Sequence, residues 1–407
     1  MTRGGIDEVR HNDNVAGAHA RNKRTDIYGN AYDQRSGNWG RYDDAAKEEQ
    51  GILGSWLTKK RCEVELDLLN PAGKPGRRYE YPPSLILFML MIKEDNRKSY
   101  RRGCGHCVAL LSALGIKAPC YATLHKSEEK FFRGDFGRSV MEEASAILAR
   151  MGQEEPFDPV LFVGSGVFPE YSAPQKVPVC QKDLDEQALK DAEAEEMRSM
   201  MEVFVSKRHA KGGEPVEGAI DGSGVGTSGC GIYMEHKWRV NDRHFIKQHA
   251  LIDMNTQDLV SFAITLESPA DARVMPPMVG GCLSMGVKLV KLTADAAYDS
   301  KENWGAVAGT DVEFVPNLKG RFKDDRGIPA RRLRRLVEEK LGKKIAHRVT
   351  GYTLRWLVEV FFSVIKRLYG DRVSSKKFCR MVLMMRVRYA LYAIHRRLIL
   401  KHMTSGV

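Results

Sequence analysis

From Glu217 onward, apolar residues follow the spacing of strands and then alternate with helical segments, and this order most constrains the fold. Runs rich in β-branched and aromatic residues, which favour strands, come first, at 217–224, 232–240, 245–254 and 259–266. Alternation follows, with helices expected at 271–285 and 301–307 and strands at 287–295 and 312–317. Antiparallel strands followed by alternating helices and strands predict an α/β fold, with a mixed sheet covered by helices on both faces.

The rest of the chain divides into segments of different character. Residues 1–50 are polar and without periodicity, so we expect a disordered polar arm. Residues 51–158 are interpreted as a small helical domain with possible DNA binding, because short helices joined by tight turns suit a helix-turn-helix-like module. We expect residues 159–215 to be a linker with an acidic helix at 183–205, whose charges form a solvated face. The α/β segment with basic C-terminal helices fills 216–407.

Helical periodicity and end signals give specific helix bounds. Pro82–Pro83–Ser84 marks the start of the first apolar helix, and Gly115 marks the end of the second. The helices expected in the N-terminal half are 84–95, 101–114, 119–132 and 138–151, followed near the C-terminus by a short basic helix within 319–350 and long helices at 352–369 and 375–401.

Positive charge is concentrated at the C-terminal end. The chain has 64 Lys and Arg against 52 Asp and Glu, a net charge of +12. Residues 319–407 carry 24 Lys and Arg against 6 Asp and Glu, so this segment holds all of the excess. A basic block on a near-neutral body indicates a polyanionic partner, nucleic acid before a membrane surface.

Other compositional features argue against membrane insertion and secretion. The longest apolar run, Leu85 to Ile92, is about eight residues, well short of the roughly 20 that a spanning helix needs. The N-terminus has no apolar signal-peptide core, and most of the eight cysteines are solitary. We therefore expect a cytoplasmic protein without membrane contact.

Three acidic residues occupy positions suited to chemistry. Asp221 follows an apolar pair on a strand that we expect to open into a turn at Gly222, and Asp295 ends a buried strand, where active groups commonly collect. Glu359 lies within a helix. Each position alone also fits a turn residue, a helix cap or a polar helix face. Together, however, the three carboxylates could hold two divalent cations for phosphoryl transfer.

The surroundings of Glu359 favour the chemical interpretation. At about 100° per residue, Tyr352, Arg355, Glu359 and Lys366 project from one continuous helix within an arc of about 60°. A carboxylate between an arginine and a lysine suits a metal-binding group flanked by cations that hold phosphates.

These residues carry a resemblance to a known family. Tyr352, Arg355, Glu359 and Lys366 have the spacing of the Y-R-E-K signature of DDE transposases of prokaryotic insertion sequences. AIDGSG and LTADAAYDS resemble the first and second aspartate motifs of that family, and Tyr298 and Asp299 follow the second aspartate. The similarity covers roughly 80–150 and 216–400, and its N-terminal part is loose.

The resemblance implies an RNase H-like catalytic domain. It implies that Asp221, Asp295 and Glu359 are catalytic and hold two Mg²⁺ (or Mn²⁺) ions, and that Tyr352, Arg355 and Lys366 contact DNA. It further implies double-stranded DNA, both element ends and target, as the partner, a homodimer in the synaptic complex and a nucleoid-associated prokaryotic protein. The 64 residues from Asp295 to Glu359 leave no room for the β insertion of some family members.

A cluster of arginines lies in this short interval. We expect Arg331, Arg332, Arg334 and Arg335 to contact DNA phosphates, although such a helix can also be a solvated surface.

The cysteine cluster has two interpretations. Cys104, Cys107, Cys120 and His125 have a spacing close to that of zinc sites, but the intervening segment is an apolar helix rather than a zinc-finger hairpin. We therefore favour buried structural thiols over zinc. Redox catalysis would need a preceding strand, which the sequence lacks.

The sequence leads to one principal function and two alternatives. We expect a transposase that cleaves DNA at insertion-sequence ends and joins them to target DNA. The alternatives are a catalytically inactive DNA-binding protein and an RNase H-like nuclease without strand transfer. The presence of three carboxylates favours the transposase and the nuclease over the inactive DNA-binding protein. Only an activity assay can distinguish DNA cleavage alone from cleavage followed by strand transfer.

Overall fold

The structure is a computed structural model, and part of the chain is described here. The described residues are 23–25, 31–33, 39–132, 136–153, 162–167, 202–210, 213–227, 245–266, 270–320, 327–375 and 378–404. The chain forms two compact units, one of residues 52–396 and one of residues 1–51 with 397–407. The expected strand at 232–240 and most of the expected acidic helix lie outside the described residues.

A mixed sheet forms the centre of the larger unit. Its strands among the described residues are β3 (Phe162–Val167), β4 (Glu202–Ser206), β5 (Val216–Thr227), β6 (Phe245–Asp253), β7 (Leu259–Leu266), β8 (Leu289–Ala294), β9 (Glu313–Pro316) and β10 (Arg372–Val373). The order is β3-β4-β7-β6-β5-β8-β9, with β10 beside β5. Strands β3 to β7 pair antiparallel, whereas β8 runs parallel to β5 and β9 parallel to β8. The prediction of a mixed sheet is confirmed.

One secondary-structure prediction is wrong at the edge of this sheet. The acidic helix was expected to run through Val205, but Glu202–Ser206 is strand β4, paired with β7. The side chains explain the difference, because Val203 and Val205 face one side of the sheet and Phe204 faces the other. All three are completely buried, as alternation in a strand covered on both faces requires.

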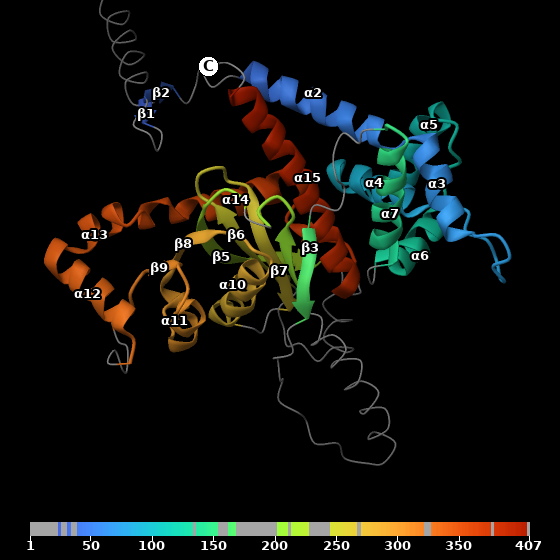
Figure 1. Cartoon of the computed structure of the whole chain (residues 1–407). Coiled ribbons are helices and arrows are strands. Elements are labelled where there is room, and N and C mark those ends of the chain that lie inside the picture. Colours follow the sequence, from blue (N-terminus) through green and yellow to red (C-terminus); the bar gives the residue numbers. More distant parts are fainter. Residues whose placement is uncertain are drawn as a thin grey trace, which may run out of the picture. The chain divides into compact units, whose positions relative to one another are not determined.

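Helices cover both faces of the sheet (Figure 1). Helix α10 (Met275–Ser284) packs on one face, next to α11 (Lys301–Val307). Helices α14 (Trp356–Tyr369) and α15 (Phe378–Thr404) pack on the other, where Tyr389 lies 4.6 Å from Phe262 between ring centroids. The Tyr389 hydroxyl donates a hydrogen bond to Gln248 Oε1 at 2.6 Å, which fixes α15 on β6.

The helical region before the sheet agrees with its sequence signals. Its helices are α3 (Lys59–Leu69), α4 (Pro83–Asp95), α5 (Tyr100–Ala113), α6 (Tyr121–Phe132) and α7 (Phe136–Arg150). The bounds of α4 to α7 agree with the predicted helices within one or two residues. No helix was predicted at the position of α3. Helix α4 begins at Pro83, where proline costs no hydrogen bond, and Gly115 adopts the left-handed conformation (φ +67°) just after α5.

A buried ion pair and two hydrogen bonds from one arginine join this helical region to the sheet within the larger unit. Arg388 on α15 is 3% exposed, and its Nε donates to Glu94 Oε2 of α4 at 2.8 Å. The same guanidinium donates to the carbonyl oxygens of Gly370 and Arg372, at 3.1 and 2.8 Å. One side chain therefore ties α4, α14 and β10 together.

The smaller unit contains regular structure where the sequence predicted none. Strands β1 (Lys23–Thr25) and β2 (Ala31–Asp33) pair antiparallel, and α2 (Trp39–Trp56) begins within the expected arm. The prediction of an unstructured segment through residue 50 is therefore wrong for these residues. Glu48 accepts hydrogen bonds from Lys401 and His402, at 2.6 and 2.7 Å. No helix of the described residues combines the length and apolarity needed to cross a membrane.

Candidate active site

Strand register brings two of the three predicted carboxylates together. Parallel pairing of β5 and β8 places Ile220 opposite Ala294, so the next residues along each strand are Asp221 and Asp295. Neighbouring strands are about 4.8 Å apart, so the two carboxylates start from adjacent backbone positions. Asp295 lies at the C-terminal end of β8, as predicted, and its Oδ1 accepts the Ala297 N–H at 2.8 Å.

Asp221 lies in the middle of its strand and not at a turn. The turn expected at Gly222 is absent from the described residues, because β5 continues through Gly222, Ser223 and Gly224 to Thr227. Pairing with β6 along the whole segment holds it extended. A side chain at position 222 would approach Asp271 at 3.1 Å and His249 at 3.2 Å, so these groups leave little space for anything but glycine.

The signature residues do not lie on one continuous helix, which corrects the prediction of a helix over 352–369. Tyr352–Arg355 form a 3-10 turn (η3), and α14 begins at Trp356. Gly351 precedes the turn in the left-handed conformation (φ +73°). The turn contacts both β5 and β8, so it presents Tyr352 and Arg355 to the sheet, while Glu359 projects from the first turn of α14.

Arg355 links the carboxylates of two different elements. Its Nη1 donates to Asp221 Oδ2 at 2.8 Å, and its Nη2 donates to Glu359 Oε1 at 2.6 Å. The side chains of Arg355 and Asp221 are 19% and 18% exposed, and that of Glu359 is 58% exposed. The guanidinium therefore lies within hydrogen-bond distance of both acids and is largely withdrawn from water.

The environment of Asp221 opposes its ionisation. Burial raises the pKa of Asp221 to about 6, and the nearby Asp295 carboxylate acts in the same direction. The Gly222 N–H, which donates to Asp221 Oδ1 at 2.8 Å, and Arg355 both lower this pKa, but burial outweighs them. A cation next to Asp221 would favour the carboxylate form.

The remaining signature residues lie beside this group. Lys366 Nζ donates to Ser223 Oγ at 2.8 Å, and Ser223 points to the same face of β5 as Asp221, two residues away. The Tyr352 ring lies 4.2 Å from that of His347 between centroids. The structure thus brings Asp221, Asp295, Tyr352, Arg355, Glu359 and Lys366 to one region.

The donor atoms of this region are of the chemical type that a hard divalent cation binds. Carboxylate oxygens are the ligands that Mg²⁺ and Mn²⁺ prefer, and the Arg355 guanidinium shows that positive charge is held between Asp221 and Glu359. Within the described residues, no three His, Cys, Asp or Glu side chains gather closely enough to hold an ion.

Two of the predicted DNA-contact arginines are buried. Helix α12 (Pro329–Leu341) turns Arg331, which is 0% exposed, toward Asp299, whose two oxygens accept from Nε at 2.8 Å and Nη2 at 2.6 Å. Arg334 is 7% exposed. The prediction that Arg331 and Arg334 meet phosphates is therefore wrong for this structure, whereas Arg332 is exposed and Arg335 half-buried. The sequence missed Asp299 as a partner for this helix.

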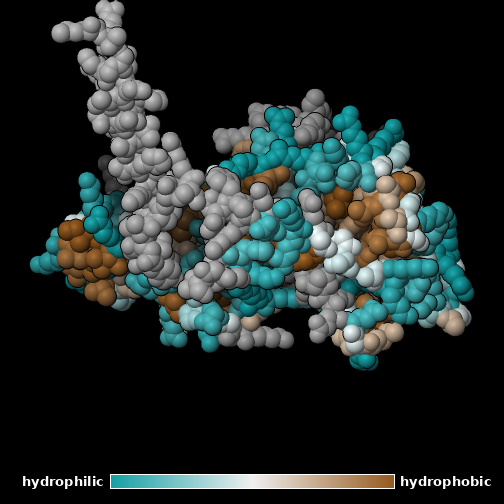
Figure 2. Space-filling view, turned by 90° about the horizontal axis from the view of Figure 1, so that it is seen from above, coloured by the Kyte–Doolittle hydropathy of each residue, from teal (hydrophilic) through white to brown (hydrophobic). Residues whose placement is uncertain are grey.

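The outer face of the same region is apolar. Leu333 is 64% exposed on α12, and Val349 is 69% exposed on α13 (Lys343–Val349). Figure 2 shows a hydrophobic patch at the left, the side on which Figure 1 places α12 and α13. The helix thus turns Arg331 and Arg334 inward and Leu333 and Leu336 outward, which charge counting along the sequence does not reveal.

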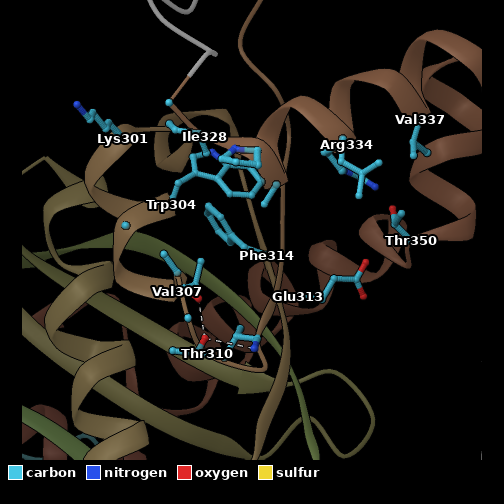
Figure 3. Close-up of a pocket in the computed structure, with 18 residues that line it drawn as sticks. Lys301, Trp304, Val307, Thr310, Glu313, Phe314, Ile328, Arg334, Val337 and Thr350 are labelled. Atoms are coloured by element: carbon cyan, nitrogen blue, oxygen red, sulfur yellow. Dashed lines mark hydrogen bonds between the residues drawn. The ribbon is translucent and has the colours of Figure 1, made fainter.

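A pocket lies between α11, β9 and α12 (Figure 3). It has a volume of about 520 Å³ and a mainly apolar lining that includes Trp304 and Phe314, whose rings meet edge to face at 4.9 Å. Arg334 also lines it and makes no hydrogen bond to the described residues, while Glu338 lies 3.9 Å away. None of the three predicted carboxylates lines this pocket.

The cysteine cluster does not form a metal site among the described residues. Cys104 and Cys107 are buried on α5, while Cys120 is exposed. His125 Nε2 contacts the Arg380 guanidinium, so its lone pair faces a hydrogen-bond donor. Burial raises the pKa of Cys107 to about 11, which disfavours the thiolate that zinc binds.

The fold and the site together define a class. A mixed sheet flanked by helices, with aspartates on adjacent strands and a glutamate on a following helix, is an RNase H-like transposase fold. Residues 212–394 match the family model of the transposase DDE domain, which supports a DDE transposase acting on DNA and covers a little under half of the chain. Among curated proteins, no relative matches this chain.

Proposed function

We propose that this protein is a transposase of a prokaryotic insertion sequence, of the branch with the Y-R-E-K signature. It cleaves DNA at the element's ends and transfers the freed 3′ ends to target DNA. The observation that carries the proposal is the parallel register of β5 and β8, which puts Asp221 and Asp295 on adjacent backbone positions. The Arg355 guanidinium then links Asp221 to Glu359 by hydrogen bonds to both carboxylates.

Asp221, Asp295 and Glu359 would hold two Mg²⁺ or Mn²⁺ ions. When bound, such ions supply an activated attacking oxygen and stabilise the leaving oxygen of the phosphodiester. The protein contributes positioning. Asp295 accepts a hydrogen bond from the Ala297 N–H and Asp221 accepts one from the Gly222 N–H, so each carboxylate is restrained in its orientation.

The cations on the same face of the sheet suit the DNA backbone. Lys366 is fixed by Ser223 and offers two further N–H donors, and Arg355 can form paired hydrogen bonds with a phosphate. Arg332 on α12, which precedes Arg355 in the sequence, is exposed to solvent and is a further positive charge available to DNA. We propose that two copies of the chain pair the element ends, because joining both ends to one target needs two active sites.

The test uses the full chain with DNA that carries the termini flanking its own reading frame. With Mg²⁺, we expect nicking at the element ends, followed by joined products when target DNA is added. Cutting without joining would support a nuclease of this fold, and binding without either would support an inactive DNA-binding protein. Activity that survives Asp295→Ala would overturn the site assignment.

A further inference from the structure

Arg355 makes contacts that conflict with metal binding at the proposed site. Asp221 Oδ1 accepts from the Gly222 N–H and Asp221 Oδ2 accepts from Arg355, so both oxygens of this carboxylate are engaged. Glu359 Oε1 accepts from the same guanidinium at 2.6 Å. Arg355 thus holds one oxygen of each carboxylate, Asp221 Oδ2 and Glu359 Oε1, and its positive charge lies beside the donors that a shared cation would use.

We infer that Arg355 is a positioning residue that acts as a counter-ion for the metal-free site and competes with the divalent cation for Asp221 and Glu359. This inference rests on the proposed function and concerns how the site is loaded. Without a cation, the single positive charge of the guanidinium offsets part of the charge of the two carboxylates and holds both side chains beside it. When the cation binds, Arg355 releases both acids.

The released Arg355 guanidinium could bind a DNA phosphate instead. Arg355 lies at the end of the η3 turn, beside α14, and Lys366 of that helix reaches Ser223 on the same face of the sheet. A DNA phosphate on this face would accept the paired hydrogen bonds that Asp221 and Glu359 give up. DNA binding and cation binding should therefore strengthen each other through Arg355, and this linkage is reciprocal.

Three variants separate this competition from simple charge effects. Arg355→Gln removes the guanidinium, and Arg355→Lys keeps the charge but cannot hold two carboxylates in the same fork. Lys366→Gln removes one positive charge from the same region without freeing either carboxylate, because Lys366 contacts Ser223. Thermal unfolding of each variant checks that it folds.

The measurement is Mn²⁺ affinity of the full chain, read from the free-Mn²⁺ electron paramagnetic resonance signal. We expect Arg355→Gln to bind Mn²⁺ about tenfold more tightly than wild type, as expected when charge-assisted hydrogen bonds no longer compete. The Mn²⁺ affinity of Arg355→Lys should lie between those of wild type and Arg355→Gln. The Mn²⁺ affinity of Lys366→Gln should differ from that of wild type by less than about threefold. DNA ends should tighten Mn²⁺ binding to wild type more than to Arg355→Gln.

Two negative results have different meanings. If Asp295→Asn abolishes Mn²⁺ binding but Arg355→Gln binds Mn²⁺ no more tightly than wild type, Arg355 does not compete with the cation. The assignment of Asp295 to the metal site is then still supported. An equal gain in Mn²⁺ affinity for Lys366→Gln would also overturn the proposed competition, because the loss of one positive charge would then explain the effect. If wild type, Arg355→Gln and Asp295→Asn all fail to bind Mn²⁺, the proposed function fails at the metal site itself.

Discussion

At the scale of single residues, buried charges decide which side chains serve the fold and which serve chemistry. Asp299 lies in the second aspartate motif, four residues after Asp295, yet its oxygens accept from Arg331, Trp304 and the Lys319 backbone. Those hydrogen bonds lower the pKa of Asp299 despite its burial. Asp299 is therefore committed to holding α12 and α11 against the end of the sheet.

Asp299→Asn should destabilise the protein strongly. The substitution removes the carboxylate that accepts two hydrogen bonds from the fully buried Arg331, and such losses cost about 3–5 kcal/mol. Chemical denaturation followed by circular dichroism measures the free energy of unfolding. Asp311→Asn, at an exposed position, is the control and should change it by less than about 0.5 kcal/mol. A similar small effect of Asp299→Asn would contradict a structural role.

His249 gives the fold a pH dependence of known sign. Burial lowers the pKa of His249 to about 4, against the opposing influence of Asp271, and its Nε2 lies 2.9 Å from Thr265 Oγ1. Between pH 6.5 and 4 the unfolded chain binds a proton here that the folded chain does not. The free energy of unfolding should therefore fall as pH drops through this range, by up to about 3 kcal/mol.

The comparison with His249→Gln isolates this contribution. Asp221, whose pKa is raised, acts in the opposite direction over nearly the same range, so only the difference between wild type and variant is informative. We expect His249→Gln to be destabilised less at pH 4.5 than at pH 7. A difference that does not change with pH would show that His249 does not titrate differently in the two states.

At the scale of elements, the sequence predicted the sheet better than the helices that flank the site. Strands β5 to β9 follow from apolar runs and turn residues, because burial on both faces leaves few alternatives for such segments. The helix through Glu359 was placed correctly, but its first four residues form η3 instead. Gly351 gives no sequence signal for this break, since glycine fits both a helix start and a loop.

Helix α12 shows a second limit of sequence analysis. Four arginines in five residues indicated a phosphate-binding surface, but which face turns inward depends on Asp299, a partner 32 residues away. Tertiary contacts of this kind leave no local pattern. The arginine positions were therefore predictable as a basic helix, while their individual exposure was not.

The orientation of α12 makes a prediction about DNA affinity. Arg332→Ala should reduce the slope of log affinity against log salt by about 1, because an exposed arginine can release a counterion from DNA. Arg334→Ala should leave that slope unchanged, since its side chain is buried. Fluorescence anisotropy with labelled DNA at several salt concentrations measures both, and equal slopes for the two variants would contradict this orientation.

At the scale of the whole molecule, the helical region and the sheet of residues 52–396 form one compact unit. The sequence indicated two separate parts, because a change in periodicity marks them but cannot show how they pack. Arg388, Glu94 and the backbone of β10 make the connection. The site on β5 and β8 is thus built on the same unit as helices α3 to α7.

Removing this connection should weaken the whole unit. Arg388→Met removes the buried donor to Glu94 Oε2 and to two carbonyl oxygens, at a cost of about 3 kcal/mol. Arg367→Met, at an exposed position of α14, is the matched control. Denaturation monitored by circular dichroism and by tryptophan fluorescence should shift together for Arg388→Met, and a shift in one signal alone would show that the two regions unfold independently.

The central claim is that Asp221, Asp295 and Glu359 act together on a DNA phosphodiester, and the rate of Mg²⁺-dependent nicking at the element's own ends tests it most directly. We predict that Asp295→Asn and Glu359→Gln each lower this rate by about 10³-fold or more, with DNA affinity within about threefold of wild type. Asp311→Asn should nick at the wild-type rate. Nicking by Asp295→Asn or Glu359→Gln at a rate close to that of Asp311→Asn would contradict the account.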